Sequence, residues 1–130
     1  MCSSDLAGLE VEYVLGTDVT TVNDTSGFPA AIAAAKRADA VIFAGGLDET
    51  VEREALDRLN VTWPGSQLEL VAALERVGKP LIVAQFGGGQ LDDSTLKNSK
   101  AVCIMLHRPS SSWPPLTVRC LRPPYFLLGR

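Results

Sequence analysis

A dense group of ionisable side chains lies between a glycine pair at 45–46 and a Pro-Gly pair at 64–65. The group comprises five carboxylates, two arginines and a tryptophan: Asp48, Glu49, Glu52, Glu54, Asp57, Arg53, Arg58 and Trp63. Carboxyl groups can donate and accept protons and can bind sugar hydroxyls, and an aromatic ring can serve as a platform for a sugar ring. Most charge-rich loops are only solvated surface, so an acidic loop without chemistry is the competing interpretation.

Glycine-rich segments follow two apolar runs, but their spacing does not match a nucleotide-binding loop. Neither Gly45-Gly46 nor Gly87-Gly88-Gly89 belongs to a GxGxxG pattern, and the Gly78-Lys79 pair is followed by Pro80. These glycines can therefore simply allow sharp turns.

The metal-binding and disulfide-forming residues are few and scattered. The single histidine, His107, argues against a histidine-based metal site or a Ser-His-Asp triad. Three cysteines, Cys2, Cys103 and Cys120, do not form a zinc knuckle or a disulfide framework. We therefore expect no metal and no cofactor.

The hydrophobic pattern predicts the elements that must position the acidic group. Alternating or continuous apolar runs predict strands over 10–15, 40–44 and 81–86. Helices are expected over 28–38 and 66–77, the second beginning with a capping box formed by Ser66 and Glu69. The order strand, helix, strand predicts a parallel βαβ unit. The fold class is α/β, an incomplete open, mainly parallel sheet flanked by helices.

Composition excludes several classes and divides the chain. With 130 residues, a net charge of −3 and a pI near 5.1, the chain is not a typical nucleic-acid binder. No apolar run approaches the roughly 20 residues of a membrane span, and the first residues do not resemble a signal peptide. All 15 acidic residues precede residue 94, whereas 101–130 contain four arginines and five prolines. We expect a domain over 1–102 and, over 103–130, a Pro/Arg-rich tail that is disordered or translated out of frame, in which His107, Cys103 and Cys120 are incidental.

The acidic group and its flanks resemble the C-terminal α/β-sandwich domain of glycoside hydrolase family 3, most closely its β-xylosidase branch. The resemblance covers about residues 9–100 and continues through 78–83 and 85–90 to Asp92-Asp93. Its most specific part reads Gly46-Leu47-Asp48-Glu49-Thr50-Val51-Glu52-Arg53-Glu54-Ala55-Leu56-Asp57-Arg58, then Asn60-Val61-Thr62-Trp63-Pro64-Gly65-Ser66-Gln67.

The resemblance implies a retaining mechanism with two carboxyl groups on different domains. The nucleophile is an aspartate of an N-terminal (β/α)8 barrel, which these 130 residues do not include. The acid/base is a glutamate of the sandwich domain, by position Glu52, with Glu54 as the runner-up. Asp57 and Arg58 match a family pair that mainly supports the loop. The chain alone is therefore expected to be inactive.

The same resemblance implies a substrate and a location. The parent enzyme acts on β-linked xylo-oligosaccharides or aryl glycosides in xylan breakdown, with no nucleic acid or membrane as partner. It is extracellular, and the triplets Asn23-Asp24-Thr25 and Asn60-Val61-Thr62 match the N-glycosylation pattern. Two alternatives remain open: a non-catalytic α/β module that binds a sugar or nucleotide, and an inactive truncated product.

Overall fold

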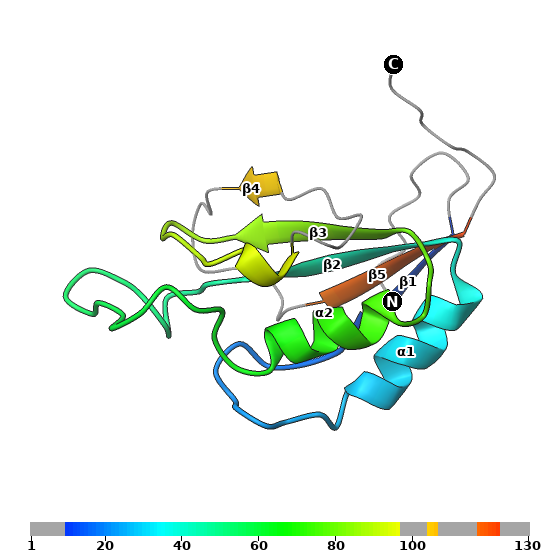
Figure 1. The fold of residues 1–130 in the computed structure, drawn as a ribbon, viewed down its shortest axis with the longest axis horizontal. Helices are drawn as coiled ribbons and strands as arrows, with labels where there is room; N and C mark the ends of the chain where they lie inside the picture. The colour runs from blue at the N-terminus through cyan, green and yellow to red at the C-terminus, as the bar shows by residue number, and fades with distance from the viewer. Residues whose placement is uncertain (1–9, 97–103, 107–116, 123–130) are drawn as a thin grey trace, which may run out of the picture.

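The computed structural model describes residues 10–96, 104–106 and 117–122, which form one mixed sheet and its covering helices (Figure 1). The strand order is β1-β5-β2-β3-β4. β2 is parallel to β3 and β3 to β4, whereas β5 is antiparallel to both β1 and β2. The elements are β1 (Glu10–Leu15), α1 (Phe28–Arg37), β2 (Ala40–Gly46), α2 (Gln67–Glu75), β3 (Leu81–Phe86), η1 (Ser94–Leu96), β4 (Ile104–Leu106) and β5 (Thr117–Arg122).

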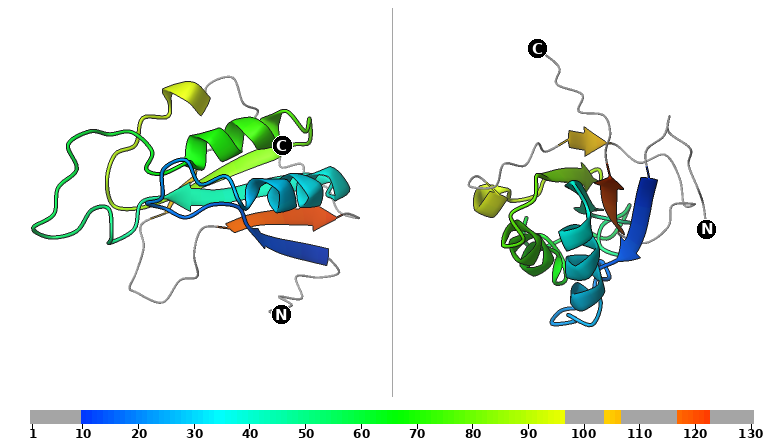
Figure 2. Two further views of the ribbon diagram at one scale, coloured as in Figure 1. Left: turned by 90° about the horizontal axis from the view of Figure 1, so that it is seen from below. Right: turned by 90° about the vertical axis from the view of Figure 1, so that its right-hand side faces the viewer.

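The core lies between the sheet and the two helices, which cover the same face (Figure 2). On β2 and β3, alternate side chains point into this core, and Phe43 and Val83 are at most 1% exposed. In α1 the buried residues are all alanines, Ala31, Ala34 and Ala35, which lets that helix approach the sheet closely. The predicted strands, helices and parallel βαβ pairing are confirmed, with the ends of the helices one or two residues shorter. None of the helices in the described part of the chain is long and apolar enough to cross a bilayer.

The capping box expected at the start of α2 is not formed. Ser66 is the N-cap residue, but its backbone has φ −98° and ψ 23°, outside the extended region from which a serine hydroxyl reaches the helix N–H groups. Its Oγ is buried and has no hydrogen-bond partner within the described residues. The prediction of the helix was right, but its proposed start signal was wrong.

Two segments of the tail, residues 104–106 and 117–122, pair with strands of the sheet, whereas composition predicts a disordered or out-of-frame tail over 103–130. Residues 104–106 extend the parallel part as β4, and β5 inserts between β1 and β2, where Arg119 is opposite Tyr13 and Ile42. The physical reason is that the five prolines of this region flank β5 without interrupting it, so each of its residues can take part in backbone pairing. Cys120 lies in β5, opposite Val41, whereas His107 and Cys103 lie outside the described residues. The domain boundary at residue 102 stays a prediction.

Candidate active site

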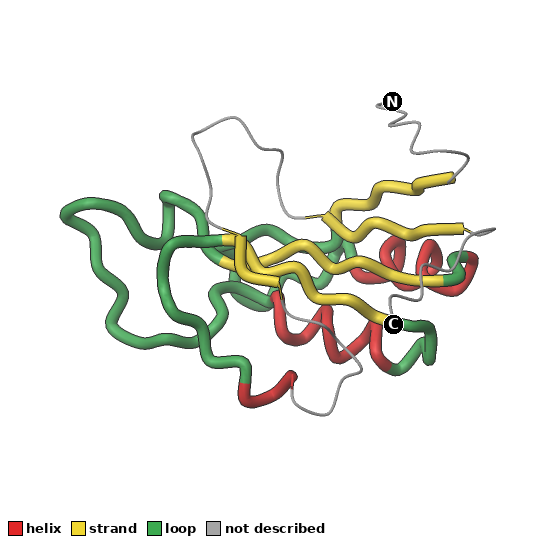
Figure 3. Tube along the Cα trace, turned by 90° about the horizontal axis from the view of Figure 1, so that it is seen from above, coloured by secondary structure: helices red, strands yellow, loops and turns green. Residues whose placement is uncertain are grey.

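Two loops meet where β2 and β3 end, and together they carry the acidic group. We call residues 47–65 the acidic loop and residues 87–93 the glycine loop. Figure 3 shows both loops extending from the same end of the strands. Because β2 and β3 are parallel, their carboxyl ends lie side by side, which is where ligands bind in open α/β sheets. Leu47 N donates a hydrogen bond of 2.8 Å to Phe86 O and joins the two loops at their start.

Gln67 holds the two ends of the acidic loop together. Its side chain is fully buried, with Oε1 accepting from Gly46 N at 2.7 Å. Its Nε2 donates to Gly46 O at 2.9 Å and to Pro64 O at 3.1 Å. Gln67 was not predicted as a site residue from the sequence. The available signal was a polar residue at the start of a largely apolar helix, and its partner Gly46 lies 21 residues away.

Trp63 belongs to the core, which corrects its proposed role as a sugar platform. The ring is 5% exposed and lies against Phe43, with ring centroids 6.3 Å apart and an interplanar angle of 45°. Its Nε1 donates to Asp93 Oδ1 at 3.1 Å, and Asp92 N donates to Val61 O at 2.7 Å. Trp63 therefore connects the acidic loop with the glycine loop from inside, and its face is not available to a ligand.

A hollow of about 300 Å³ opens between the two loops. Glu52 lines it with a side chain that is 32% exposed, whereas the runner-up Glu54 is exposed and does not line it. The residues that line the hollow are Leu47, Asp48, Glu49, Glu52, Arg53, Asp57, Gly87, Gly88 and Gly89. The hollow is therefore polar and carries an excess of carboxylates.

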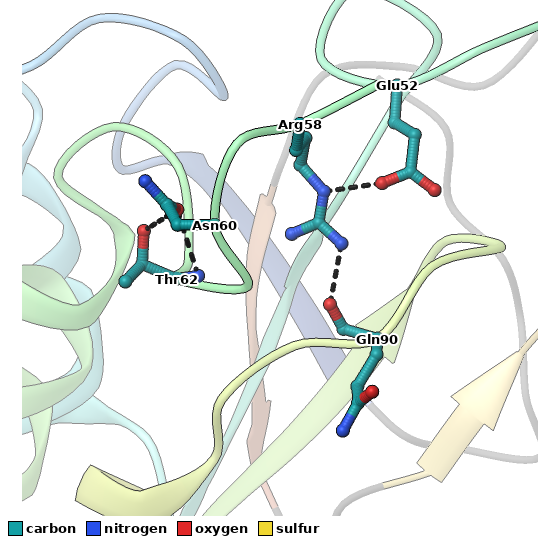
Figure 4. A network of polar contacts seen from close by, with 5 residues as sticks. All are labelled: Glu52, Arg58, Asn60, Thr62 and Gln90. Atoms are coloured by element: carbon teal, nitrogen blue, oxygen red, sulfur yellow. Dashed lines mark hydrogen bonds and ion pairs between the residues drawn. The ribbon is translucent and has the colours of Figure 1, made fainter. Parts of the chain in front are cut away.

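Glu52 is held by Arg58, which also reaches the glycine loop (Figure 4). Arg58 Nε donates to Glu52 Oε2 in an ion pair, and Arg58 Nη2 donates to Gln90 O at 2.6 Å. The Arg58 side chain is only 11% exposed, so this pair is better shielded from solvent than an ordinary surface ion pair. The expected support of the loop by Arg58 therefore acts directly on the candidate acid/base carboxylate.

The other charged residues of the acidic loop shape its backbone or its rim. Asp48 Oδ1 accepts from Thr50 N at 2.9 Å, and Asp48 O accepts from Glu52 N at 3.1 Å, which closes a turn that orients Glu52. Arg53 Nη1 donates to Glu49 O at 2.9 Å. Asp57 is exposed at the rim of the hollow. No group of three or more metal-binding side chains comes together within the described residues.

Comparison with known proteins identifies relatives of this chain. The family model for the glycosyl hydrolase family 3 C-terminal domain matches residues 9–109. Exo-1,4-beta-xylosidase xlnD of Emericella nidulans is 57% identical over 100 residues, which are 77% of this chain and 12% of the relative. A probable exo-1,4-beta-xylosidase xlnD of Aspergillus terreus is 50% identical over 106 residues, 82% of this chain and 13% of the relative.

A solved structure shows the same similarity in three dimensions. It is that of a GH3 exo-beta-xylosidase (XlnD) in complex with a xylobiose aziridine activity-based probe. The two structures superpose with a TM-score of 0.63 at 59% identity, over 65% of this chain and 11% of that chain. This chain thus spans about an eighth of the length of the relatives it matches.

Proposed function

Because the chain belongs to glycoside hydrolase family 3, of whose C-terminal domain it forms part, we propose that it supplies the acid/base carboxyl of a retaining β-xylosidase. The observation that carries the proposal is the position of Glu52. Its carboxylate lines the hollow at the carboxyl ends of two parallel strands, and a shielded arginine holds it there. The relatives named as exo-1,4-beta-xylosidases support a β-linked xyloside as the substrate.

In this mechanism Glu52 acts twice. It first donates its proton to the oxygen of the departing group as the glycosidic bond breaks and the nucleophile bonds to the sugar. It then removes a proton from the water that releases the sugar from the nucleophile. By the family resemblance, the nucleophile is an aspartate of the barrel domain. The two carboxyl groups must lie about 5–5.5 Å apart, so the hollow described above would be one half of the complete site.

The placement of Glu54 supports Glu52 as the acid/base. Glu54 is exposed beside Ala55, which has a positive φ of 66° at the turn of the acidic loop. Arg53 and Leu56 close that turn by hydrogen bonds in both directions. A carboxyl group at this turn lies outside the lining of the hollow, so Glu54 remains the second candidate.

The proposal predicts that this chain is inactive alone and active in a complete enzyme. A suitable complete enzyme is a chimera in which residues 9–109 replace the matching segment of the Emericella nidulans relative. We expect the chimera, but not the 130-residue chain, to hydrolyse xylobiose and aryl β-xylosides, because only the chimera holds both carboxyl groups. Hydrolysis is measured by released xylose or aryl alcohol.

Two results would contradict this proposal. Turnover by the 130-residue chain alone would show that its own residues complete a catalytic site. A folded chimera that binds xylobiose without hydrolysing it would instead favour the non-catalytic binding module. The parent relative without the replacement is the control for folding and assay conditions.

We also propose that the parent enzyme is secreted and takes part in xylan breakdown, which the exposed glycosylation triplets support. Asn60 Oδ1 accepts hydrogen bonds from Thr62 N at 3.1 Å and Thr62 Oγ1 at 2.5 Å. Behind a secretory leader in a fungal host, we expect the chain to carry an N-glycan on Asn60 that an endoglycosidase removes. Thr62→Ser should keep the glycan and Thr62→Ala should lose it; an unmodified Asn60 in the secreted chain would contradict the proposal. Mass spectrometry of the tryptic peptide after Arg58 measures the outcome.

A further inference from the structure

Gly89 differs in backbone conformation from Gly87, the first residue of the glycine loop. Gly87 has a φ of +140°, a conformation that residues with a side chain rarely adopt. Gly89 is not among the glycines with positive φ, so its φ does not require a glycine. The feature that distinguishes position 89 is the lack of space for a side chain.

That space is occupied by the Glu52–Arg58 ion pair. A Cβ atom built on Gly89 would lie 2.5 Å from Glu52 Oε1, 2.8 Å from Glu52 Oε2 and 2.9 Å from Arg58 Nη2. All three distances are shorter than van der Waals contact. The atoms in question are the ends of two flexible side chains and not backbone. A methyl group at position 89 would therefore move the carboxylate and the guanidinium, while the fold could stay as it is.

Arg58 fixes the carboxylate in this space by making contacts in two directions. Its Nε binds Glu52, and its Nη2 binds the main-chain oxygen of Gln90, the residue next to Gly89. The planar guanidinium presents both donors at a fixed angle, which a lysine ammonium on its flexible stem does not reproduce. Arg58 thus fixes the orientation of the Glu52 carboxylate relative to the glycine loop.

We propose that Gly89 and Arg58 are positioning residues for Glu52: Arg58 directs the carboxylate, and the absence of a side chain at position 89 leaves the room that the ion pair needs. This inference rests on the proposed function of Glu52 as the acid/base. Proton transfer requires that the carboxyl group be within hydrogen-bond reach of the leaving oxygen. A misplacement of about 1 Å can cost about 100-fold in rate.

The first experiment uses the 130-residue chain and does not depend on activity. In Gly89→Ala, we expect the NMR signal of the Arg58 Nε–H to shift, while the midpoint of thermal unfolding stays that of the original chain. Thr95→Ala, an exposed change six residues further along, should alter neither quantity. An unchanged Arg58 signal in Gly89→Ala would overturn the proposal, because the ion pair would then tolerate the added methyl group in place.

The second experiment uses the chimera and the dependence of its rate on the leaving group. Gly89→Ala should lower kcat for xylobiose by about 10- to 100-fold and lower it less for an activated aryl β-xyloside, which needs less help from a general acid. Arg58→Lys should show the same pattern, and Arg58→Met a larger loss, because methionine offers no donor. An equal loss on both substrates would indicate a merely structural role and overturn the proposal.

The outcome for Glu52 separates this inference from the proposed function. If Glu52→Ala shows the leaving-group dependence and Gly89→Ala does not, Glu52 is the acid/base and only the positioning role fails. If Glu52→Ala itself lacks that dependence, the proposed function fails and the positioning role fails with it.

Discussion

Hydrolysis of xylobiose by the chimera is expected to fall by about 10²- to 10⁴-fold when Glu52 is replaced by alanine, the range that general acid–base catalysis contributes. An activated aryl β-xyloside should lose much less in the first chemical step. Its leaving group departs as a stable anion, whereas the sugar alcohol that leaves xylobiose needs a proton as the bond breaks. The measurement is kcat/KM for both substrates in the original chimera and in Glu52→Ala.

Azide provides the complementary test of the second step. In Glu52→Ala no carboxylate activates the water that releases the sugar, and a small anionic nucleophile can replace that water without a base. Added azide should therefore restore turnover of the activated substrate and yield a xylosyl azide. Glu54→Ala is the matched control and should leave rate and product unchanged. If Glu54→Ala shows this pattern instead, the assignment moves two residues along the loop, and if neither does, the acid/base lies elsewhere.

Replacement of Gly46 by alanine should have the largest effect on stability. Gly46 has a φ of +132°, and a Cβ atom there would lie 2.0 Å from Phe86 O, a main-chain atom of the neighbouring strand. The unfavourable backbone conformation alone costs on the order of 1–3 kcal/mol, and the collision adds to it. We expect the free energy of unfolding to fall by at least about 3 kcal/mol. Urea unfolding of the 130-residue chain, followed by circular dichroism, measures it.

Gly78→Ala is the matched comparison. Gly78 also has a positive φ, of +78°, but a Cβ atom there would meet nothing within 4 Å. The cost should therefore be only the left-handed conformation itself, about 1–2 kcal/mol. Equal losses in the two variants would mean that the close contact of β2 and β3 does not contribute, and that these strand ends separate more readily than the structure indicates. The contact matters for function because it brings the acidic loop against the glycine loop.

The elements that rest on local patterns could be predicted from the amino-acid sequence. The apolar run of β2 and the punctuated pattern of α2 depend on residues close together in the chain, so their type and approximate limits could be predicted. The long charge-rich loop between them was evident for the same reason. Glu52 could be selected within that loop by the family resemblance, because the surrounding motif is continuous in sequence.

Features that depend on residues far apart in the chain could not be predicted and became visible in the folded structure. β5 pairs Arg119 with Tyr13 across more than a hundred positions, a register that proline-rich flanks concealed. Trp63 is a core residue that packs against Phe43 and donates a hydrogen bond to Asp93. Gly89, a turn glycine by its sequence, lies against the Glu52–Arg58 pair, where a Cβ atom would collide with it. In each case the deciding contact joins segments that are far apart in the sequence. The environment of each residue, and therefore its role, exists only after the loops and strands have come together.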